Sequence, residues 1–235
     1  MADQPRVYYD HEPAYRIIKE RGGRGWDALF PGNDPAASYL EFDAFFAGEH
    51  PAAGATALDV GCGGGQLTIE LARRGFRTTG VDVSATASEL AQANAREAGV
   101  DVQLQVGNVL DLAGLSDDSF DLVIDNHLLH CIVAADDRAR VLASLYRVLV
   151  PGGRLWSATM SAEGNFNPAR FDADPATAIA RNGRRIWVRR AQLEQELIAA
   201  GFMIASLMLV DDPIPEDGTD LVTIARKPEV PPRRW

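Results

Sequence analysis

The hydrophobic and polar positions of this chain follow two alternating periods between about residues 55 and 160. Short apolar runs are typical of buried strands, and the longer runs between them carry apolar residues at helical spacing. We expect strands over 55–60, 77–83, 102–106, 120–124 and 154–159, and helices over 66–74, 85–98 and from about 136 to the Pro-Gly-Gly at 151–153. A helix over 191–200 and strands over 202–210 and 221–226 complete the pattern. This order predicts an α/β fold with a doubly wound, seven-stranded, mostly parallel sheet.

The same pattern predicts how the chain is organised. Residues 51–228 form one nucleotide-binding α/β domain, and residues 1–50, which are rich in aromatic side chains, form a short helical cap over the active site. Residues 160–188 have no periodicity and are too long for an ordinary connection, which predicts a lid or substrate loop. Residues 229–235 are expected to be a loose tail.

Composition narrows the class of protein. Of the 235 residues, 46% are hydrophobic and 24% are charged, as is typical of a folded globular chain. The formal charge of -10 would repel a nucleic-acid backbone, so no nucleic-acid partner is expected. The sequence has no apolar run of membrane-spanning length and begins with acids and prolines, so we expect neither a membrane partner nor a secretory signal. Two widely separated cysteines give no disulfide framework, so we expect a cytoplasmic protein. The sequence leaves open whether the protein is a monomer or a homodimer.

A glycine-rich turn follows the first predicted strand, in the segment DVGCGGG at residues 59–65. Glycines at such a turn let backbone amides approach a ligand that a Cβ would exclude. The next strand ends in Asp82, at the position where a carboxylate can accept hydrogen bonds from both ribose hydroxyls. The acidic Asp59 just before the turn would repel a pyrophosphate, which argues against a nicotinamide dinucleotide.

Several motifs in order resemble class I S-adenosylmethionine-dependent methyltransferases. They are ALDVGCGGGQLTIELARRG at 57–75, TGVDVS at 79–84, VGNVLDL at 106–112, FDLVIDNHLLH at 120–130 and LYRVLVPGGRL at 145–155. The resemblance implies the Rossmann-like methyltransferase fold, S-adenosylmethionine as cofactor and S-adenosylhomocysteine as product. The cofactor-binding residues that it implies are Asp59, Gly61, Cys62, Gly63, Asp82, Val83, Asn108, Val109 and Asp125.

Two of these positions carry specific expectations from the resemblance. Asp59 matches an acid that lies near the methionine amino group. Asn108 stands where many members of the family have an aspartate that binds the adenine amino group, and its amide oxygen can accept the same hydrogen bond. Val109 would offer its backbone amide to the adenine ring.

The segment after the fourth strand is the predicted catalytic region. Asp125, Asn126 and His127 lie at the carboxyl end of the sheet beside the methionine part of the cofactor, and His127 is the candidate general base. The alternative is that one of them caps the following helix. His130 is interpreted as a structural histidine. His127, His130 and Cys131 lack a second ligand pair, so no metal site is expected.

The acceptor pocket is expected between the cap and the lid. Candidate substrate-binding residues are Tyr8, Tyr9, Trp26, Met160, Asn165 and Phe166, with Phe171 beside them. Core packing is an equal alternative for the aromatic residues of the cap. Five arginines between 181 and 190 form either a solvated face or a site for an acidic acceptor.

The sequence therefore predicts an enzyme that moves a methyl group from S-adenosylmethionine to an N or O nucleophile of a small molecule. Two alternatives stay open. The chain could use S-adenosylmethionine without methylation, for example by cyclising its aminobutyrate arm. It could also bind the cofactor without catalysis, or modify a macromolecule through partner-binding surfaces.

Overall fold

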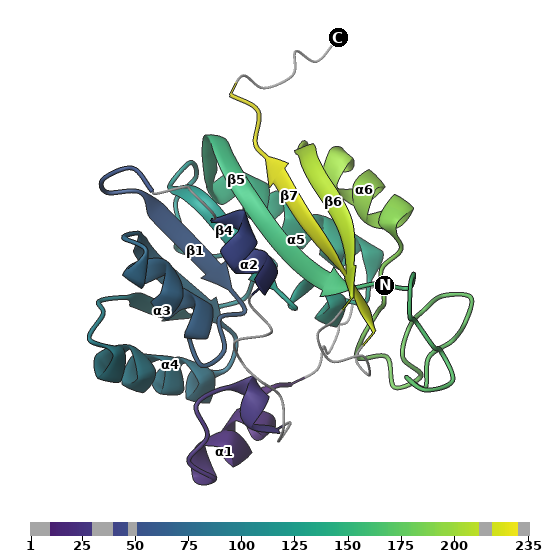
Figure 1. Cartoon of the computed structure of the whole chain (residues 1–235), viewed down its shortest axis with the longest axis horizontal. Helices are drawn as coiled ribbons and strands as arrows, with labels where there is room; N and C mark the ends of the chain where they lie inside the picture. The colour runs from purple at the N-terminus through teal and green to yellow at the C-terminus, as the bar shows by residue number, and fades with distance from the viewer. Residues whose placement is uncertain (1–9, 30–39, 47–50, 212–217, 230–235) are drawn as a thin grey trace, which may run out of the picture.

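The computed structural model describes residues 10–29, 40–46, 51–211 and 218–229. Seven strands form one sheet in the order β3-β2-β1-β4-β5-β7-β6, in which only β7 runs antiparallel to its neighbours (Figure 1). The strands are β1 Thr56–Val60, β2 Arg77–Asp82, β3 Gln103–Val106, β4 Phe120–Asn126, β5 Leu149–Met160, β6 Met203–Asp211 and β7 Thr219–Arg226. The predicted doubly wound, mostly parallel seven-stranded sheet is confirmed.

Helices cover both faces of the sheet. They are α1 Glu12–Glu20, α2 Leu40–Phe45, α3 Gln66–Arg73, α4 Ala85–Ala98, α5 Ala135–Val148 and α6 Arg190–Ala199, with short 3-10 turns η1 Trp26–Leu29 and η3 Leu129–Cys131. Helix α4 begins where Ser84 Oγ accepts the Ala87 N–H at 3.0 Å, and it ends at Gly99 with a φ of +68°. Both ends agree with the sequence signals for capping.

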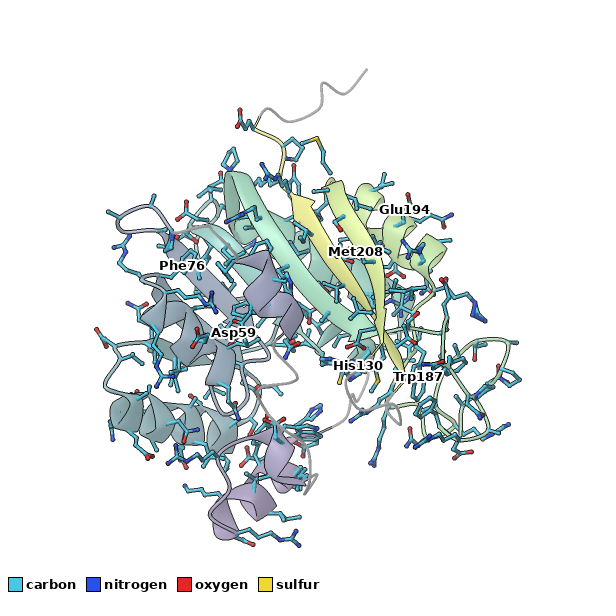
Figure 2. All side chains as sticks on the ribbon, viewed as in Figure 1. Asp59, Phe76, His130, Trp187, Glu194 and Met208 are labelled. Carbon is cyan, nitrogen blue, oxygen red and sulfur yellow. The ribbon has the colours of Figure 1, made fainter. Side chains whose placement is uncertain are left out.

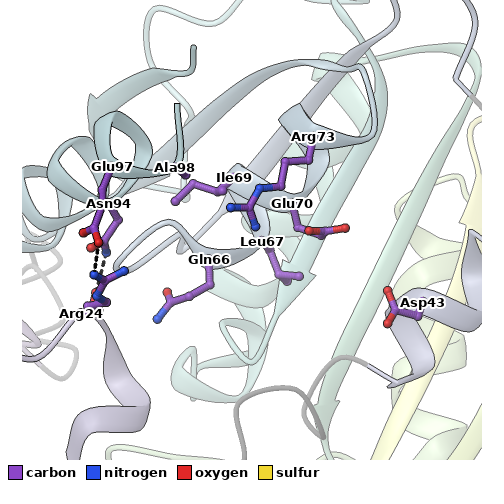
Figure 3. A pocket seen from close by; sticks show the side chains of 10 residues that line it. All are labelled: Arg24, Asp43, Gln66, Leu67, Ile69, Glu70, Arg73, Asn94, Glu97 and Ala98. Atoms are coloured by element: carbon purple, nitrogen blue, oxygen red, sulfur yellow. Dashed lines mark hydrogen bonds and ion pairs between the residues drawn. The ribbon is translucent and has the colours of Figure 1, made fainter. Parts of the chain in front are cut away.

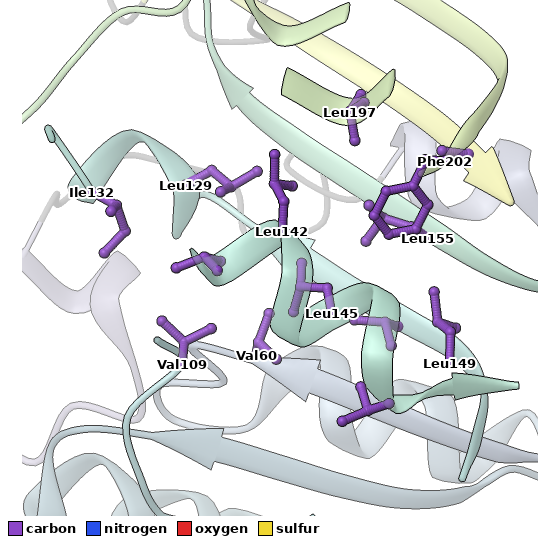
Figure 4. Packing of buried hydrophobic residues seen from close by; sticks show 14 of the residues in the cluster. Val60, Val109, Leu129, Ile132, Leu142, Leu145, Leu149, Leu155, Leu197 and Phe202 are labelled. Atoms are coloured by element: carbon purple, nitrogen blue, oxygen red, sulfur yellow. The ribbon is translucent and has the colours of Figure 1, made fainter. Parts of the chain in front are cut away.

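Alternating side chains of the strands build two separate cores. Leu58 and Val123 point to the face covered by α5 and α6, whereas Ala57 and Leu122 point to the face covered by α2 and α3. Figure 4 shows the first of these clusters, with side chains of α5 packed between β-strand residues. Each fully buried leucine contributes about 1.5–3 kcal/mol relative to an exposed one. The two cores hold the central strands in fixed register and so fix the carboxyl edge of the sheet.

The fifth strand is longer than predicted. Helix α5 ends at Val148, and β5 begins directly at Leu149, so that Pro151, Gly152 and Gly153 belong to the strand instead of a separate turn. Gly152 has a φ of +82°, and the pairing with β4 shifts register between Phe120 and Leu122. The Pro-Gly-Gly signal therefore marks an irregularity inside the strand, which the sequence pattern alone did not distinguish from a helix stop.

Candidate active site

The glycine-rich turn between β1 and α3 has backbone angles that favour glycine. Gly61 has a φ of +70° and Gly63 a φ of +53°. A Cβ on Gly61 would lie 2.6 Å from Leu128 Cδ1, and a Cβ on Gly63 would collide with the Tyr15 hydroxyl. The amides of Gly61 and Cys62 both donate to the Val81 carbonyl, at 2.8 and 3.1 Å, which anchors the turn to β2. Both glycines are therefore required by the backbone and by their neighbours.

Asp82 ties this turn to the end of β2. One carboxylate oxygen accepts the Gly63 N–H at 2.9 Å, and the other accepts the Ser84 N–H at 2.8 Å. A carboxylate oxygen has two lone pairs, so each oxygen keeps one acceptor position after these bonds. Asp82 is 8% exposed. The residue can therefore hold the turn in place and still accept hydrogen bonds from a diol.

Three carboxylates are buried next to each other at this edge. Asp59, Asp82 and Asp125 are 2%, 8% and 0% exposed. Their hydrogen-bond partners are hydroxyls and backbone amides, and no Lys or Arg of the described ranges forms an ion pair with them. Such a cluster favours a ligand that brings positive charge into the site.

Burial shifts the pKa of each of these acids upward. Burial raises the pKa of Asp59 from 3.8 to about 7, the Thr68 hydroxyl at 2.6 Å opposes the shift, and the charge of Asp82 adds to it. Burial also raises the pKa of Asp82 and that of Asp125. Asp59 therefore changes its charge near neutral pH.

Asp125, predicted as a catalytic and cofactor-binding residue, is held in place by hydrogen bonds near the end of β4. Its carboxylate accepts the Ser157 Oγ–H at 2.6 Å and the amides of Leu128 and Leu129 at 2.9 and 3.3 Å. It is completely buried and presents no surface to an acceptor molecule. Asp125 thus caps the turn that contains η3, which is the alternative that the sequence left open for this segment.

His127 follows β4 and forms a pair that the sequence did not predict. Its Nε2 lies 3.0 Å from Asp220 Oδ2, and 34% of its side chain is exposed. The His127 N–H donates to the Ala158 carbonyl at 2.9 Å. The backbone of His127 is left-handed, with a φ of +62°, a conformation that costs a non-glycine residue about 1–3 kcal/mol and is common at functional sites. Asn126, the last residue of β4, is partly buried beside it.

Asp220 reaches His127 because β7 is antiparallel. Asp220 is near the start of β7 and pairs in register with Met160 at the end of β5. The start of an antiparallel strand lies at the same edge as the carboxyl ends of its parallel neighbours. A sequence signal for this residue would have required knowing the strand order, since nothing in the local sequence distinguishes it.

His130 and Cys131 lie in the short turn η3, and both side chains are uncharged. His130 is 3% exposed, its ring centroid is 5.4 Å from that of His127, and burial holds its pKa well below the usual range. Burial raises the pKa of the Cys131 thiol to about 11, and its Sγ lies 3.9 Å from His11 Nε2. Within the described ranges, no three His, Cys, Asp or Glu side chains come close enough together to hold a metal ion.

The predicted adenine side is partly exposed. Val83 is 61% exposed, and Val109 is 9% exposed within the core. The Asn108 amide oxygen accepts the Leu110 N–H at 3.0 Å, so the oxygen expected to face adenine already closes a local turn. Cys62 is 8% exposed, and burial raises the pKa of its thiol well above the usual range. Cys62 therefore contributes backbone and packing instead of a reactive thiolate.

The N-terminal cap lies over the start of α4 (Figure 1). Glu12 accepts hydrogen bonds from Ser84 Oγ at 2.6 Å, Thr86 Oγ1 at 2.6 Å and the Thr86 amide at 3.1 Å. Trp26 packs against Tyr15, with ring centroids 5.7 Å apart, and against His11 at 5.2 Å. Trp26 thus packs within the cap, and Tyr8 and Tyr9 lie outside the described residues.

The predicted lid has a small core of its own. Phe166 and Phe171 stack near Trp187, with centroids 5.5 and 5.0 Å from the indole. Their rings pack within the loop, and their assignment as pocket residues stays a prediction. Asn165 is exposed and its amide donates to Thr219 Oγ1 at 3.0 Å. Met160, another predicted pocket residue, is the last residue of β5 and so lies at the carboxyl edge of the sheet. In Figure 2, His130 lies between Asp59 and Trp187.

A separate hollow of about 550 Å³ lies on the helical layer. Its lining comes from α3 and the second half of α4, together with Arg24 and Asp43 (Figure 3). None of the predicted site residues lines this hollow, and the Arg24–Glu97 ion pair lies at one side of it. We do not assign the reaction to it.

Comparison with known proteins identifies the class. Residues 58–157 match a family model described as a methyltransferase domain. Ubiquinone biosynthesis O-methyltransferase of Xanthomonas euvesicatoria is 39% identical over 119 residues, which are 51% of this chain and 47% of that protein. The corresponding enzyme of Pseudomonas entomophila is 34% identical over the same length. These matches span about half the length of the curated relatives.

Solved structures extend the likeness to nearly the whole chain. A Burkholderia thailandensis 1,6-didemethyltoxoflavin-N1-methyltransferase, solved with S-adenosylhomocysteine, has a TM-score of 0.66 and 24% identity, over 97% of this chain and 93% of that one. A structure described as converting a disulfide bond into a thioacetal group in echinomycin biosynthesis has a TM-score of 0.66 and 28% identity, over 93% and 91%.

These findings confirm the resemblance drawn from the motifs. Residues 58–157 are a methyltransferase domain, and its class is the Rossmann-like class I of S-adenosylmethionine-dependent methyltransferases. S-adenosylmethionine is the cofactor of that class, as the sequence predicted. None of the helices in the described part of the chain is both long and apolar enough to cross a membrane.

Proposed function

We propose that the chain transfers the methyl group of S-adenosylmethionine to a nitrogen or oxygen nucleophile of a small molecule. The observation that carries this proposal is the His127–Asp220 pair, which lies at the same edge of the sheet as three buried carboxylates. One part of this edge suits a cationic cofactor, and the other suits removal of a proton from an acceptor.

The residues at the edge fit the cofactor by charge. S-adenosylmethionine carries a sulfonium and an α-ammonium group, so it would compensate the buried carboxylate cluster, whereas a pyrophosphate would add repulsion. Asp82 would accept the ribose hydroxyls with its two remaining lone pairs. Asp59 would face the ammonium group, and the backbone of Gly61 and Gly63 would lie against the cofactor. When bound, the cofactor would supply a methyl group to a nucleophile aligned with the C–S bond, and S-adenosylhomocysteine would leave as that bond breaks.

Removal of a proton from the acceptor would depend on His127. An Nε2–H donated to Asp220 leaves a lone pair on Nδ1, which is the atom that would take a proton from an acceptor hydroxyl. The Asp220 carboxylate would then stabilise the imidazolium. A neutral amine needs this base less, because its lone pair is available before deprotonation. Holding the acceptor about 3 Å from the methyl carbon supplies most of the remaining rate enhancement.

The acceptor is proposed to be a small molecule for two reasons. The formal charge of -10 disfavours a nucleic acid. The cap and the lid lie at the same edge of the sheet as His127, since Tyr15 contacts the Gly63 position and the Ile186 amide donates to the His130 carbonyl at 2.9 Å. Both elements would enclose an acceptor of limited size.

Calorimetry with the purified chain tests the proposal. We expect micromolar binding of S-adenosylmethionine, no comparable binding of NAD, and an intact cofactor by mass spectrometry until an acceptor is added. A panel of phenols and primary amines should then yield methylated products and S-adenosylhomocysteine. Conversion to methylthioadenosine without an acceptor would replace this proposal with cyclisation, and absence of S-adenosylmethionine binding would reject it.

A further inference from the structure

The five arginines between residues 181 and 190 divide into two groups by their partners. Arg181 lies 3.3 Å from an Asp172 carboxylate oxygen, and Arg189 donates to the Ala176 carbonyl at 3.2 Å. Arg190 donates to the Leu207 carbonyl, and Arg184 also has an interaction partner. Four of the five therefore already have interaction partners. Arg185 differs from them.

Arg185 is held against the candidate active site by its backbone neighbours. The next residue, Ile186, donates its N–H to the His130 carbonyl at 2.9 Å, and Val188 donates to the Met160 carbonyl at 2.8 Å. These bonds attach this arm of the lid to η3 and to the end of β5. The Arg185 guanidinium is partly buried, and its Nη1 lies 4.0 Å from Met160 Sδ. The same Met160 is the register partner of Asp220, which binds His127.

The neighbours of Arg185 do not neutralise its charge. Among the described residues, no carboxylate lies within the 4.0 Å ion-pair distance of Arg185. His130 is a buried neutral imidazole, Cys131 carries a neutral thiol, and Met160 offers a thioether. Asp220, the register partner of Met160, is already paired with His127. A partly buried guanidinium without a counter-charge favours an anion that arrives with a ligand.

We propose that Arg185 binds a carboxylate on the acceptor, so that the substrate of this chain is a small carboxylic acid that also carries the methyl-accepting nitrogen or oxygen. This inference rests on the proposed methyl transfer, since it assigns the acceptor half of the same site. Arg185 would orient the molecule through two parallel N–H···O bonds, while His127 faces the nucleophile. The other four arginines would not contact the acceptor.

Binding measurements on matched probes test this assignment without turnover. The probes are 3-hydroxybenzoate and 3-hydroxybenzyl alcohol, which share the ring and the phenol and differ in the carboxylate. Each is titrated into the chain saturated with S-adenosylhomocysteine. We expect the acid to bind at least about tenfold more tightly than the alcohol, as for a hydrogen-bonded charged group. Arg185→Gln should remove this preference, and Arg185→Lys should retain part of it.

Arg181→Gln is the matched control, because it removes an arginine from the same loop that is paired with Asp172. It should keep the full preference for the acid. An equal preference in wild type and Arg185→Gln, or no preference in wild type at millimolar probe, would overturn the assignment. Cofactor binding is measured separately in each variant. Its absence in wild type would reject the proposed methyl transfer, whereas its retention with loss of acid preference in Arg185→Gln alone supports the role of Arg185.

Discussion

The two halves of the carboxyl edge are built in different ways. On the cofactor side, the turn after β1 and the end of β2 are joined by short backbone bonds, such as Asp82 to the Gly63 amide and Gly61 to the Val81 carbonyl. On the acceptor side, His127 meets Asp220 and the lid meets η3, and these segments are far apart in the sequence. One half is a local motif, and the other depends on the order of the strands.

In the proposed function, this difference separates cofactor binding from acceptor binding. The cofactor side is fixed by glycine angles and by core packing on both faces of β1 and β2, so a change there disturbs the binding of a common cofactor. The acceptor side is held by side chains on β7 and the lid, which can change without altering those strands. Variants on the two sides should therefore affect different measurements, and the following predictions are ordered from the largest expected effect to the smallest.

Replacing His127, the proposed base, should have the largest effect: it should lower the rate and leave cofactor binding unchanged. His127→Gln is expected to lower kcat with a phenol acceptor by about 100-fold or more, as for loss of a general base, while the Kd for S-adenosylmethionine stays unchanged. The rate is measured as S-adenosylhomocysteine formed, and the Kd by calorimetry. Asp220→Asn should act in the same direction, with a smaller loss and a shifted pH profile. A parallel loss of cofactor affinity in both variants would contradict the division between the halves.

Replacing Asp82, at the end of β2, should change the affinity for S-adenosylmethionine. Asp82→Ala is expected to weaken S-adenosylmethionine binding by about 1–3 kcal/mol, because two diol contacts and the acceptors for two backbone amides are lost. Asp101→Ala, at an exposed position before β3, is the control and should bind normally. Unchanged affinity of Asp82→Ala by calorimetry would remove Asp82 from the site.

The raised pKa of Asp59 predicts a pH dependence near neutrality. The folded chain keeps a proton between pH 3.8 and about 7 that the unfolded chain has released, so the free energy of unfolding should fall as pH rises through this window. Asp59→Asn should flatten this trend in urea unfolding followed by fluorescence. Identical pH profiles of the two proteins would show that Asp59 ionises as an ordinary acid.

Cofactor binding should show the opposite trend over the same window. A cationic ligand favours ionised Asp59, so its affinity should rise by several-fold from pH 5.5 to 7.5 and be accompanied by proton release. Calorimetry in buffers of different ionisation enthalpy measures the released proton. The Asp59→Asn variant should bind with little pH dependence in this range, and a rise of equal size in that variant would assign the effect to another group.

Loosening the cap should have the smallest effect. Hydrogen bonds from Ser84 and Thr86 hold the pKa of Glu12 at about 2, below its usual 4.5, so the contact stabilises the fold above pH 4.5 and is lost as pH falls from 4.5 toward 2. Because Glu12 is partly exposed, Glu12→Gln should cost no more than about 1 kcal/mol. Hydrogen exchange of the α1 amides should increase at neutral pH. Global destabilisation of α5 or β4 would show that the cap is part of the main core.

The sequence predicted the local half of the molecule and not the distant half. The fold class, the glycine turn and Asp82 follow from periodicity and from the spacing within strand–turn–helix units. Asp125 is predicted to be catalytic because it follows the apolar run at 120–124, whereas its hydrogen bond with Ser157 is not visible in the sequence. Asp220 was missed because its meeting with His127 depends on an antiparallel strand at the far end of the chain. Phe166 and Phe171 were assigned to a pocket because a lid with its own aromatic core has no periodic signature.

The reversed direction of β7 has a consequence for how such a protein could be altered. The strand enters the sheet at the edge that carries His127, so Asp220 near its start pairs with the His127 ring, and β7 lies between β5 and β6. A library restricted to Asp220, Met160 and Arg185 would therefore sample new substrate preferences in a scaffold whose cofactor site is left intact. New acceptor preferences could then be selected without changing the residues that bind the methyl donor.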